Sequence, residues 1–246
     1  MAKKNIFLWF ALALVLSTLC YLLYVLISYP YQWEAVKPYR SLFIKGWGAT
    51  VAISIASLVV SSILGMLLTV GQKHDNVVVR GLSRGYVELV RGTPLLAQLL
   101  IGYYVLAPAL GLENKILLGV LLLSAFAAAY LCEIFRGGIE SVAKSQVDAA
   151  RAVGFTNRQT YRYVILPQAI KRVVPAVAGQ FANLVKDSSL LSVIGIAEFT
   201  KQAQDVTAVT YSTYECYLPL AIGYLLITLP LSWWSRRLER QLHFDS

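Results

Sequence analysis

Long runs without charged residues alternate with short polar segments along this chain. About 20 apolar residues are enough for a helix to cross the hydrocarbon core of a bilayer. Five runs in this chain reach or approach that length. A sixth apolar segment, residues 173–197, is interrupted near its middle by Lys186 and Asp187. The pattern predicts an all-α, polytopic membrane protein with about six transmembrane helices. The five runs that lack Asp, Glu, Lys and Arg cover residues 5–33, 46–72, 92–112, 116–132 and 216–235.

The composition supports a membrane protein. Hydrophobic residues make up 57% of the 246-residue chain and charged residues only 14%, whereas soluble domains carry about 25% charged residues. With the N-terminus placed in the cytoplasm, fifteen Lys and Arg residues fall in cytoplasmic segments and five on the opposite side. Because cytoplasmic loops collect positive charge, this asymmetry predicts that both termini are cytoplasmic. It also explains the net charge of +9 without a nucleic-acid partner.

The longest predicted cytoplasmic segment, residues 136–172, carries signals for two short helices. Ser145 is a candidate N-cap, and Asp148 at the third helical position closes a capping box. Gly154 is placed to end this first helix, since glycine readily adopts the left-handed conformation of a C-terminal cap. The pattern predicts a first helix and a glycine turn outside the membrane core.

A second capping signal follows the glycine turn. Thr156 and Gln159 repeat the spacing of a capping box and predict the start of another helix. Pro167 disfavours helical geometry at Leu166, so the second helix is expected to end or kink there. The result is a helix-turn-helix lying outside the membrane.

Both predicted helices are amphipathic, which leaves two interpretations open. Basic helices with an aromatic edge commonly rest on lipid headgroups, so the segment could be a connector at the membrane surface. Alternatively, it docks a soluble subunit. The apolar stripes consist of Val147, Ala150 and, less cleanly, Val153 on the first helix, and of Tyr161, Val164 and Ile165 on the second, where Arg158 and Arg162 line another face.

The stretch DAARAVGFTNRQTYRYVILP, residues 148–167, matches a family pattern. It resembles the EAA loop of the membrane subunits of ATP-binding-cassette (ABC) importers. That pattern has an acidic residue and two alanines, a glycine four positions after the second alanine, and a closing isoleucine-leucine-proline. Asp stands here for the usual Glu, which keeps the charge and shortens the side chain by one methylene. The matching residues are Asp148, Ala149, Ala150, Gly154, Ile165, Leu166 and Pro167.

Further stretches extend the resemblance over residues 44–242 in one register. They are similar to the polar-amino-acid branch of these permeases, the histidine, arginine and glutamine type. The resemblance implies a five-helix type I ABC importer core in residues 44–246, preceded by an additional transmembrane helix and extracytoplasmic linker in residues 1–43. The stretches are YVELVRGTPLLAQLL (86–100), EIFRGGIESV (133–142), QTYRYVILPQA (159–169), LVKDSSLLSVIGIAEFT (184–200) and SRRLERQL (235–242).

The resemblance also implies partners and a location. Such a subunit lies in the bacterial inner membrane, pairs with an identical or related permease, and receives a polar amino acid from an extracytoplasmic solute-binding protein. It is driven by a separate ABC ATPase dimer. The residues that the resemblance assigns to ATPase coupling are Asp148, Ala149, Ala150, Gly154, Arg158 and Pro167.

The chain itself lacks the signature of a nucleotide-binding protein. No G-x-x-x-x-G-K-[ST] phosphate loop occurs in the sequence. ATP and Mg²⁺ are therefore expected on the partner ATPase, and this chain is expected to be no enzyme and to need no cofactor of its own. The segment 198–215 is expected to close the outer mouth, where the solute-binding protein would dock.

Ionisable side chains inside the predicted spans form a second set of candidates, because a charge at the bilayer centre costs about 2.5 to 3.5 kcal/mol. Lys186 and Asp187 point about 100° apart on a helix, so each needs another partner. In one interpretation Asp187 or Ser188 caps a short helix over residues 189–194, and Lys186 pairs with Glu88. In the other, these groups serve a substrate.

A predicted helix break adds to these candidates. Glu88 and Arg91 have the spacing of an intrahelical ion pair, and Pro94 after them frees a carbonyl one turn earlier. Transporters build binding sites at such breaks. Glu133 and Arg136 have the same spacing and are interpreted as a structural anchor. The predicted substrate pathway comprises Glu88, Arg91, Gln98, Lys186, Asp187 and Ser188.

Two other classes of protein remain as alternatives. An amino-acid transporter driven by an ion gradient typically has two related halves, and the sequence shows no internal repeat. An integral-membrane enzyme needs a catalytic constellation, and the sequence shows neither metal-ligand spacing nor a nucleophile with its base. No metal site is expected.

Overall fold

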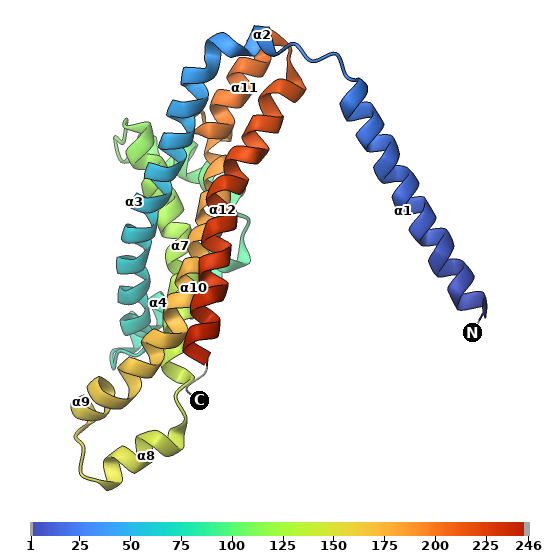
Figure 1. The fold of residues 1–246 in the computed structure, drawn as a ribbon. Coiled ribbons are helices and arrows are strands. Elements are labelled where there is room, and N and C mark those ends of the chain that lie inside the picture. Colours follow the sequence, from blue (N-terminus) through green and yellow to red (C-terminus); the bar gives the residue numbers. More distant parts are fainter. Residues whose placement is uncertain (1, 244–246) are drawn as a thin grey trace.

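The computed structural model describes residues 2–243, and all regular structure in that range is helical (Figure 1). Tight 3₁₀ or wider π turns join several of the helices. The predicted all-α polytopic fold is confirmed. The helices are α1 (Ala2–Ser28), α2 (Trp33–Val36), α3 (Arg40–Gln72), α4 (Val77–Gly92), α5 (Leu95–Ile101), α6 (Ala107–Ala109), α7 (Lys115–Glu140), α8 (Lys144–Ala152), α9 (Asn157–Thr160), α10 (Leu166–Asp187), α11 (Phe199–Thr210) and α12 (Thr213–His243).

Three helical stretches in the described residues are long and apolar enough to cross a membrane by themselves. A fourth crossing is possible where α4 and the helix Leu95–Ala109 meet at a bend of 109°. The helix α1 has 27 residues and is therefore about 40 Å long at 1.5 Å per residue. The three stretches are Trp33–Gln72, Lys115–Glu140 and Thr213–Gln241.

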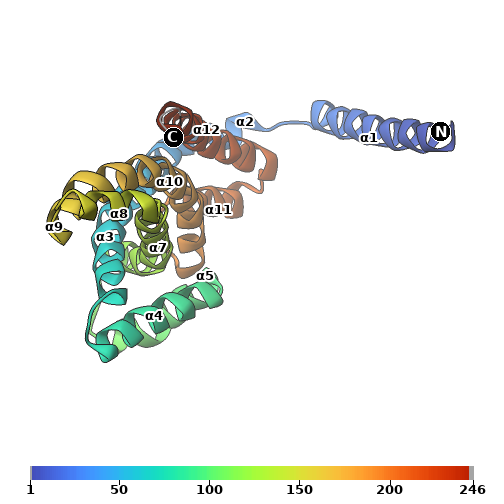
Figure 2. The ribbon, with the colours of Figure 1, turned by 90° about the horizontal axis from the view of Figure 1, so that it is seen from below.

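The centre of the bundle is formed by α3, α7 and α10, with α11 and α12 packed beside them (Figures 1 and 2). Small residues bring α3 and α7 close together. The Ser124 hydroxyl of α7 donates to the Ser57 carbonyl of α3 at 3.3 Å, and the Thr69 hydroxyl of α3 donates to the Cys132 carbonyl at 3.2 Å. Small and hydroxyl residues at helix contacts are typical of membrane bundles, where lipid provides no hydrophobic drive between helices.

The outward faces of the bundle are apolar. Large hydrophobic side chains along α3 and α12 are more than a third exposed, which suits a surface in contact with lipid tails and would be unusual for a soluble monomer. Examples are Ile55, Val59, Ile63 and Leu67 on α3 and Ile222, Leu225, Leu226 and Leu229 on α12.

The helix α1 stands apart from the bundle, and the short linker 29–32 joins it to α2 (Figures 1 and 2). From the end of the bundle that carries α2, α1 and α12 both extend toward the end that carries α8 and α9 (Figure 1). The proposed division into residues 1–43 and 44–246 stays a prediction.

A close helix contact makes one glycine of α3 sensitive to substitution. A Cβ atom at Gly65 would lie 2.9 Å from the Leu131 Cβ and 3.1 Å from the Ala128 carbonyl oxygen of α7. We expect Gly65→Ala to destabilise the fold by about 1–3 kcal/mol, as overpacking does, and to lower the melting temperature in detergent.

A second glycine of α3 provides the control. Nothing lies within 4 Å of a Cβ atom at Gly48, so Gly48→Ala should leave the melting temperature unchanged or raise it slightly. Equal melting temperatures for the two variants would contradict the close α3–α7 contact.

Candidate functional site

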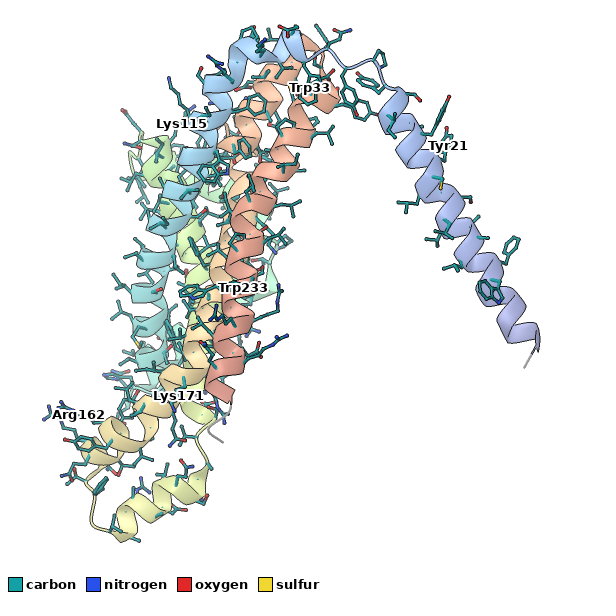
Figure 3. All side chains as sticks on the ribbon, in the orientation of Figure 1. Tyr21, Trp33, Lys115, Arg162, Lys171 and Trp233 are labelled. Carbon is teal, nitrogen blue, oxygen red and sulfur yellow. The ribbon has the colours of Figure 1, made fainter. Side chains whose placement is uncertain are left out.

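A helix-turn-helix elbow, residues 141–168, projects from one end of the bundle beyond the ends of α7 and α10 (Figures 1 and 3). The predicted N-cap of its first helix is wrong. Ala143 occupies the cap position without a side-chain hydrogen bond, and Ser145 already lies inside α8. The chain leaves α7 through a short turn and enters α8 two residues early, so the Ser145 side chain has no free amide group to cap.

The predicted glycine stop of α8 is confirmed. Gly154 has φ +89°, and its N–H donates to the Arg151 carbonyl while the Phe155 N–H donates to the Ala150 carbonyl, both at 3.0 Å. This pair of hydrogen bonds is the Schellman motif, in which a left-handed residue satisfies the last carbonyls of a helix. The turn is therefore fixed by backbone geometry that glycine adopts without strain.

The second helix of the elbow begins as the sequence predicts. Thr156 and Gln159 form a complete capping box, with the Thr156 N–H donating to the Gln159 side-chain carbonyl at 2.8 Å. The predicted end or kink at Leu166 takes another form, because helical structure runs on from α9 into α10 through a π turn, Tyr161–Ile165. A widened turn just before Pro167 accommodates the ring and the missing N–H that would disrupt a regular α-helix.

Most of the residues assigned to ATPase coupling lie on the surface of the elbow. Ala150 is the exception and is buried against the second arm, and a hydrogen bond of 2.6 Å from Gln168 to Gln146 also joins the two arms. Val153, expected to extend the apolar stripe of α8, instead lies at the tip and is 74% exposed. Of the residues assigned to ATPase coupling, the exposed ones are Asp148, Ala149, Gly154, Arg158 and Pro167.

The tip of the elbow presents an apolar surface. Phe155 and Tyr163 form an edge-to-face pair with ring centroids 6.3 Å apart, and both remain at least 38% exposed. Tyr161 lies nearby in the chain and is 43% exposed. Aromatic side chains that stay uncovered at a protruding turn are typical anchors of protein contacts.

The predicted break between α4 and α5 is present, and Gln98 bridges it. Pro94 stands at the start of α5 and contributes no N–H, so the Val90 carbonyl loses its helical partner. The Gln98 side-chain amide donates to that carbonyl at 2.8 Å and to the Thr93 carbonyl and hydroxyl at 3.2 and 2.8 Å. Gln98 is thus a stabilising residue of the break through its amide nitrogen.

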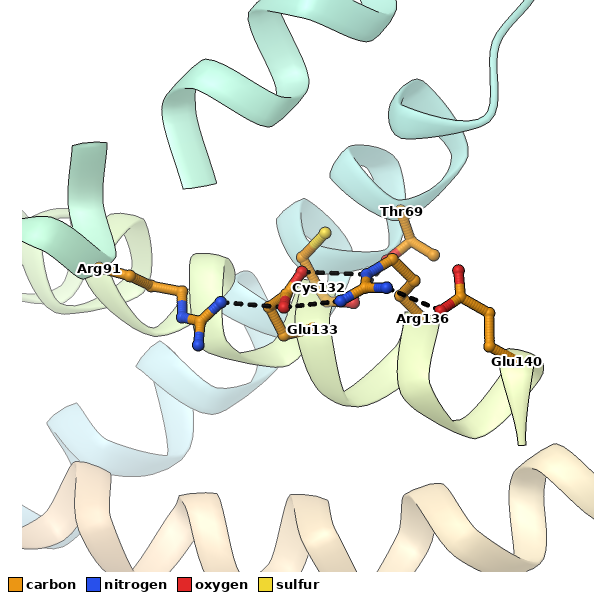
Figure 4. Close-up of polar contacts among 6 residues, drawn as sticks. All are labelled: Thr69, Arg91, Cys132, Glu133, Arg136 and Glu140. Carbon is orange, nitrogen blue, oxygen red and sulfur yellow. Dashed lines mark hydrogen bonds and ion pairs between the residues drawn. The ribbon is translucent and has the colours of Figure 1, made fainter. Parts of the chain in front are cut away.

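Arg91 pairs across helices rather than along its own helix. The predicted Glu88–Arg91 pair is wrong, because the Arg91 guanidinium reaches Glu133 of α7 at 2.9 Å (Figure 4). It also lies over the Tyr130 ring, 5.9 Å from its centroid. The Arg91 side chain lies toward α7, while Glu88 stays exposed on α4.

The predicted Glu133–Arg136 pair is confirmed and belongs to a longer chain of charges. Arg136 donates to Glu133 at 2.8 Å and to Glu140 at 2.7 Å (Figure 4). Glu133 therefore joins the bend after α4 to the end of α7 that leads into the elbow.

The second polar interruption, at the end of α10, forms no side-chain cap. Asp187 has helical backbone geometry without a capping hydrogen bond, and the Ser188 hydroxyl donates back to the Val185 carbonyl at 2.8 Å. The interpretation in which Asp187 or Ser188 caps the following helix is therefore wrong, because the helix tightens directly into a 3₁₀ segment, Ser188–Ile194. Within the described part of the chain, no ion pair joins Lys186 to Glu88.

The predicted pathway residues do not form one cluster in the single chain. Lys186 lines a groove of about 410 Å³ between α10 and α12, which no residue of α4 or α5 lines. The side chains of Arg91, Gln98 and Ser188 are engaged by their own chain. Within residues 2–243, the side chains of Glu88, Lys186 and Asp187 form no hydrogen bond or ion pair. The groove is lined by Ala176, Gly179, Gln180, Ala182, Asn183, Lys186, Ser232, Ser235 and Arg236.

The sequence did not point to Glu198, a fully buried acid at the start of α11. Its carboxylate accepts from the backbone N–H groups of Thr200 and Lys201 at 2.9 and 2.8 Å. It also accepts from the Thr50 hydroxyl of α3 at 3.1 Å and the Tyr224 hydroxyl of α12 at 3.0 Å. An acid just before an amphipathic stretch is an N-cap signal, which could have located it.

A polytopic helical bundle with broken helices, buried polar groups and a protruding elbow defines an integral-membrane transport component. Residues 61–244 match the family of binding-protein-dependent transport system inner membrane components. The chain belongs to this family.

Two relatives match this chain over nearly their whole length. The chain is 33% identical over 214 residues to the Escherichia coli K12 glutamine transport system permease protein GlnP, covering 86% of this chain and 98% of that protein. It is 36% identical over 203 residues to the probable glutamine ABC transporter permease protein GlnM of Bacillus subtilis 168, covering 82% and 94%.

Solved structures show the same fold. A crystal structure of an amino acid ABC transporter with histidines superposes with a TM-score of 0.81 at 33% identity, covering 87% of this chain and 100% of that one. A MetNI methionine ABC transporter in an inward-facing conformation superposes with a TM-score of 0.70 at 17% identity, covering 83% and 98%. The type I ABC importer permease fold is confirmed.

The Gln98 bridge can be tested by removing its donor. Gln98→Leu leaves the Val90 carbonyl without a partner, and an unsatisfied buried polar group costs about 1–3 kcal/mol. We expect a lower melting temperature in detergent. Gln204→Leu, on the exposed face of α11, is the control and should melt like the parent protein. A Gln98→Leu variant that melts like the control would contradict the bridging role.

Proposed function

We propose that this chain is the membrane subunit of an ATP-driven importer and carries a polar amino acid across the bacterial inner membrane. Family membership and the amino-acid permeases among the relatives support this proposal. The exposed apolar tip of the elbow is the strongest structural support for this function. Such a tip is costly to leave in water, and burial stabilises apolar surface by about 25 cal/mol per Å².

The elbow is the docking site for a separate ABC ATPase dimer. The charged side chains of Asp148 and Arg158 are exposed, form no hydrogen bond or ion pair in the described structure, and are free to contact a partner. Because the two arms continue into α7 and α10, a displacement of the elbow moves both central helices. ATP and Mg²⁺ bind to the ATPase, and this chain holds no cofactor.

The complete importer contains further partners. A second permease, identical or related, completes the membrane domain, and an extracytoplasmic solute-binding protein delivers the amino acid. The elbow and both termini lie on the cytoplasmic side, as the distribution of Lys and Arg favours. The segment 198–215 at the opposite end then faces the solute-binding protein.

The substrate pathway passes the charged side chains that have no hydrogen-bond or ion-pair partner within the described part of this chain. Glu88, Lys186 and Asp187 are the candidates that this chain does not already bind, and an uncompensated charge inside a membrane is a functional candidate by default. An amino acid needs an acceptor for its ammonium group and a donor for its carboxylate, and these residues offer both signs. Arg91, Gln98 and Ser188 border the pathway and shape the backbone there.

Transport in proteoliposomes tests this function. Uptake should require the ATPase subunit, the solute-binding protein and ATP together. Uptake driven by a sodium or proton gradient without these partners would identify a secondary transporter and overturn the proposal.

A charge at the glycine turn tests the docking role of the elbow. Gly154 is exposed, and nothing lies within 4 Å of a Cβ atom built on it, so Gly154→Glu adds bulk and charge directly to the proposed contact. We expect membrane insertion at the parent level and loss of at least nine-tenths of transport-coupled ATP hydrolysis. Val153→Glu, next to it at the tip, should act in the same way without affecting the left-handed turn.

Another left-handed glycine serves as the matched control. Gly111 has φ +65°, is exposed and has the same open surroundings, but it lies in the turn between α6 and α7, at the far end of α7 from the elbow (Figure 1). Gly111→Glu carries the same backbone strain and should keep coupled hydrolysis. Normal transport by Gly154→Glu, or equal losses in both variants, would rule out docking at the elbow.

A further inference from the structure

A cavity of about 520 Å³ opens at the end of the bundle opposite the elbow, where α3 and α12 begin. It combines an apolar wall with charges of both signs. Neither the transport family nor the coupling elbow explains it. The cavity is lined by Trp33, Glu34, Val36, Lys37, Arg40, Phe43, Ile44, Glu215 and Pro219.

Glu215 is the unusual group in this cavity. Its side chain is fully buried, and one carboxylate oxygen, Oε1, accepts the backbone N–H of Gln32. The other oxygen, Oε2, has no hydrogen-bond partner in the described structure. A buried carboxylate oxygen without a donor is costly, so a cationic hydrogen-bond donor that reached this oxygen would be stabilised.

A positive charge is available on the same cavity. Arg40 is exposed and forms no ion pair with any described residue, whereas Lys37 is paired with Glu34 at 3.2 Å. A guanidinium binds phosphate and carboxylate groups well. The cavity thus offers one free acceptor for a cation and one free donor for an anion, beside an apolar wall that includes Phe43 and Ile44.

Aromatic side chains mark the depth of the cavity in the membrane. Tyr29 and Tyr214 pack with ring centroids 4.2 Å apart, and Tyr31 stacks on Trp33 at 5.7 Å. Tyr and Trp concentrate where lipid headgroups meet the hydrocarbon core. Trp33 also lines the cavity, so this aromatic cluster supports a position of the cavity at headgroup depth.

We infer that this cavity binds the headgroup of an aminophospholipid of the phosphatidylethanolamine class. The primary ammonium donates to Oε2 of Glu215, and the phosphate accepts from the Arg40 guanidinium. The first part of an acyl chain lies along the apolar wall of Val36, Phe43 and Ile44. This binding is independent of which amino acid is transported.

A competition between two lipids tests the site. The purified full-length protein is delipidated, and equal amounts of phosphatidylethanolamine and phosphatidylcholine with identical acyl chains are added. Bound lipids are counted by native mass spectrometry. We expect about a tenfold preference for phosphatidylethanolamine, because the quaternary ammonium of phosphatidylcholine has no N–H to donate and a charged hydrogen bond is lost. Equal retention of both lipids would overturn the proposal.

Substitutions separate the two contacts. Glu215→Gln keeps an acceptor for the Gln32 N–H and should abolish the preference between the lipids. Arg40→Gln should weaken both lipids equally, because both carry the phosphate. Glu113→Gln changes an exposed acid that does not line this cavity and should behave as the parent protein.

The remaining outcomes also decide the question. If Glu215→Gln does not fold, the competition on the parent protein and the Arg40→Gln result stand alone as the test. A preference unchanged in a folded Glu215→Gln variant would exclude Glu215 as the ammonium ligand. If millimolar free glutamine displaces phosphatidylethanolamine, the cavity is a substrate entry site and the lipid assignment is wrong.

Discussion

Lipid supplies no hydrogen bonds, so a chain in a bilayer must satisfy its own backbone wherever a helix breaks. Two breaks in this bundle show how that is done. At the first, the Gln98 amide donates to the Val90 carbonyl, which Pro94 leaves without a partner, and to the Thr93 carbonyl. At the second, the Glu198 carboxylate accepts the free N–H groups at the start of α11. A donor serves the end of one helix and an acceptor the beginning of another, which keeps both breaks rigid.

Because the bundle satisfies most of its own polar groups, the exceptions identify where other molecules bind. The elbow has uncovered aromatic rings and unpaired charges, and its turn is rigid owing to Gly154 and the Thr156–Gln159 capping box. One arm runs into α10 as continuous helical structure, and the short turn 141–143 joins the other arm to α7. On α7, Glu133 and Arg136 extend this rigid path to the break after α4. In the coupling mechanism that we propose, a force applied to the elbow reaches both polar regions of the proposed pathway.

Local signals in the sequence were sufficient for the fold and much of the elbow, since apolar run length, the Thr156–Gln159 box and the Gly154 stop depend on nearby residues. Long-range pairing was not predictable. Arg91 is three residues from Glu88 but pairs with Glu133, because α4 packs against α7 and brings this acid of a distant segment within reach. Ser145 has good capping chemistry, yet α8 starts earlier. Glu198 depends on partners about 150 and 26 residues away, and no single segment of sequence displays that arrangement.

The docking of the ATPase at the elbow is tested most directly by cross-linking. In a Cys20→Ser background, which removes the one exposed native cysteine of residues 2–243, a photo-crosslinker is placed on Val153→Cys at the tip or on Tyr211→Cys, an 87% exposed residue at the opposite end. In the assembled transporter, the probe at position 153 should link to the ATPase and the probe at position 211 should not. Linkage of position 153 to lipid alone, with none to the ATPase, would contradict coupling through the elbow.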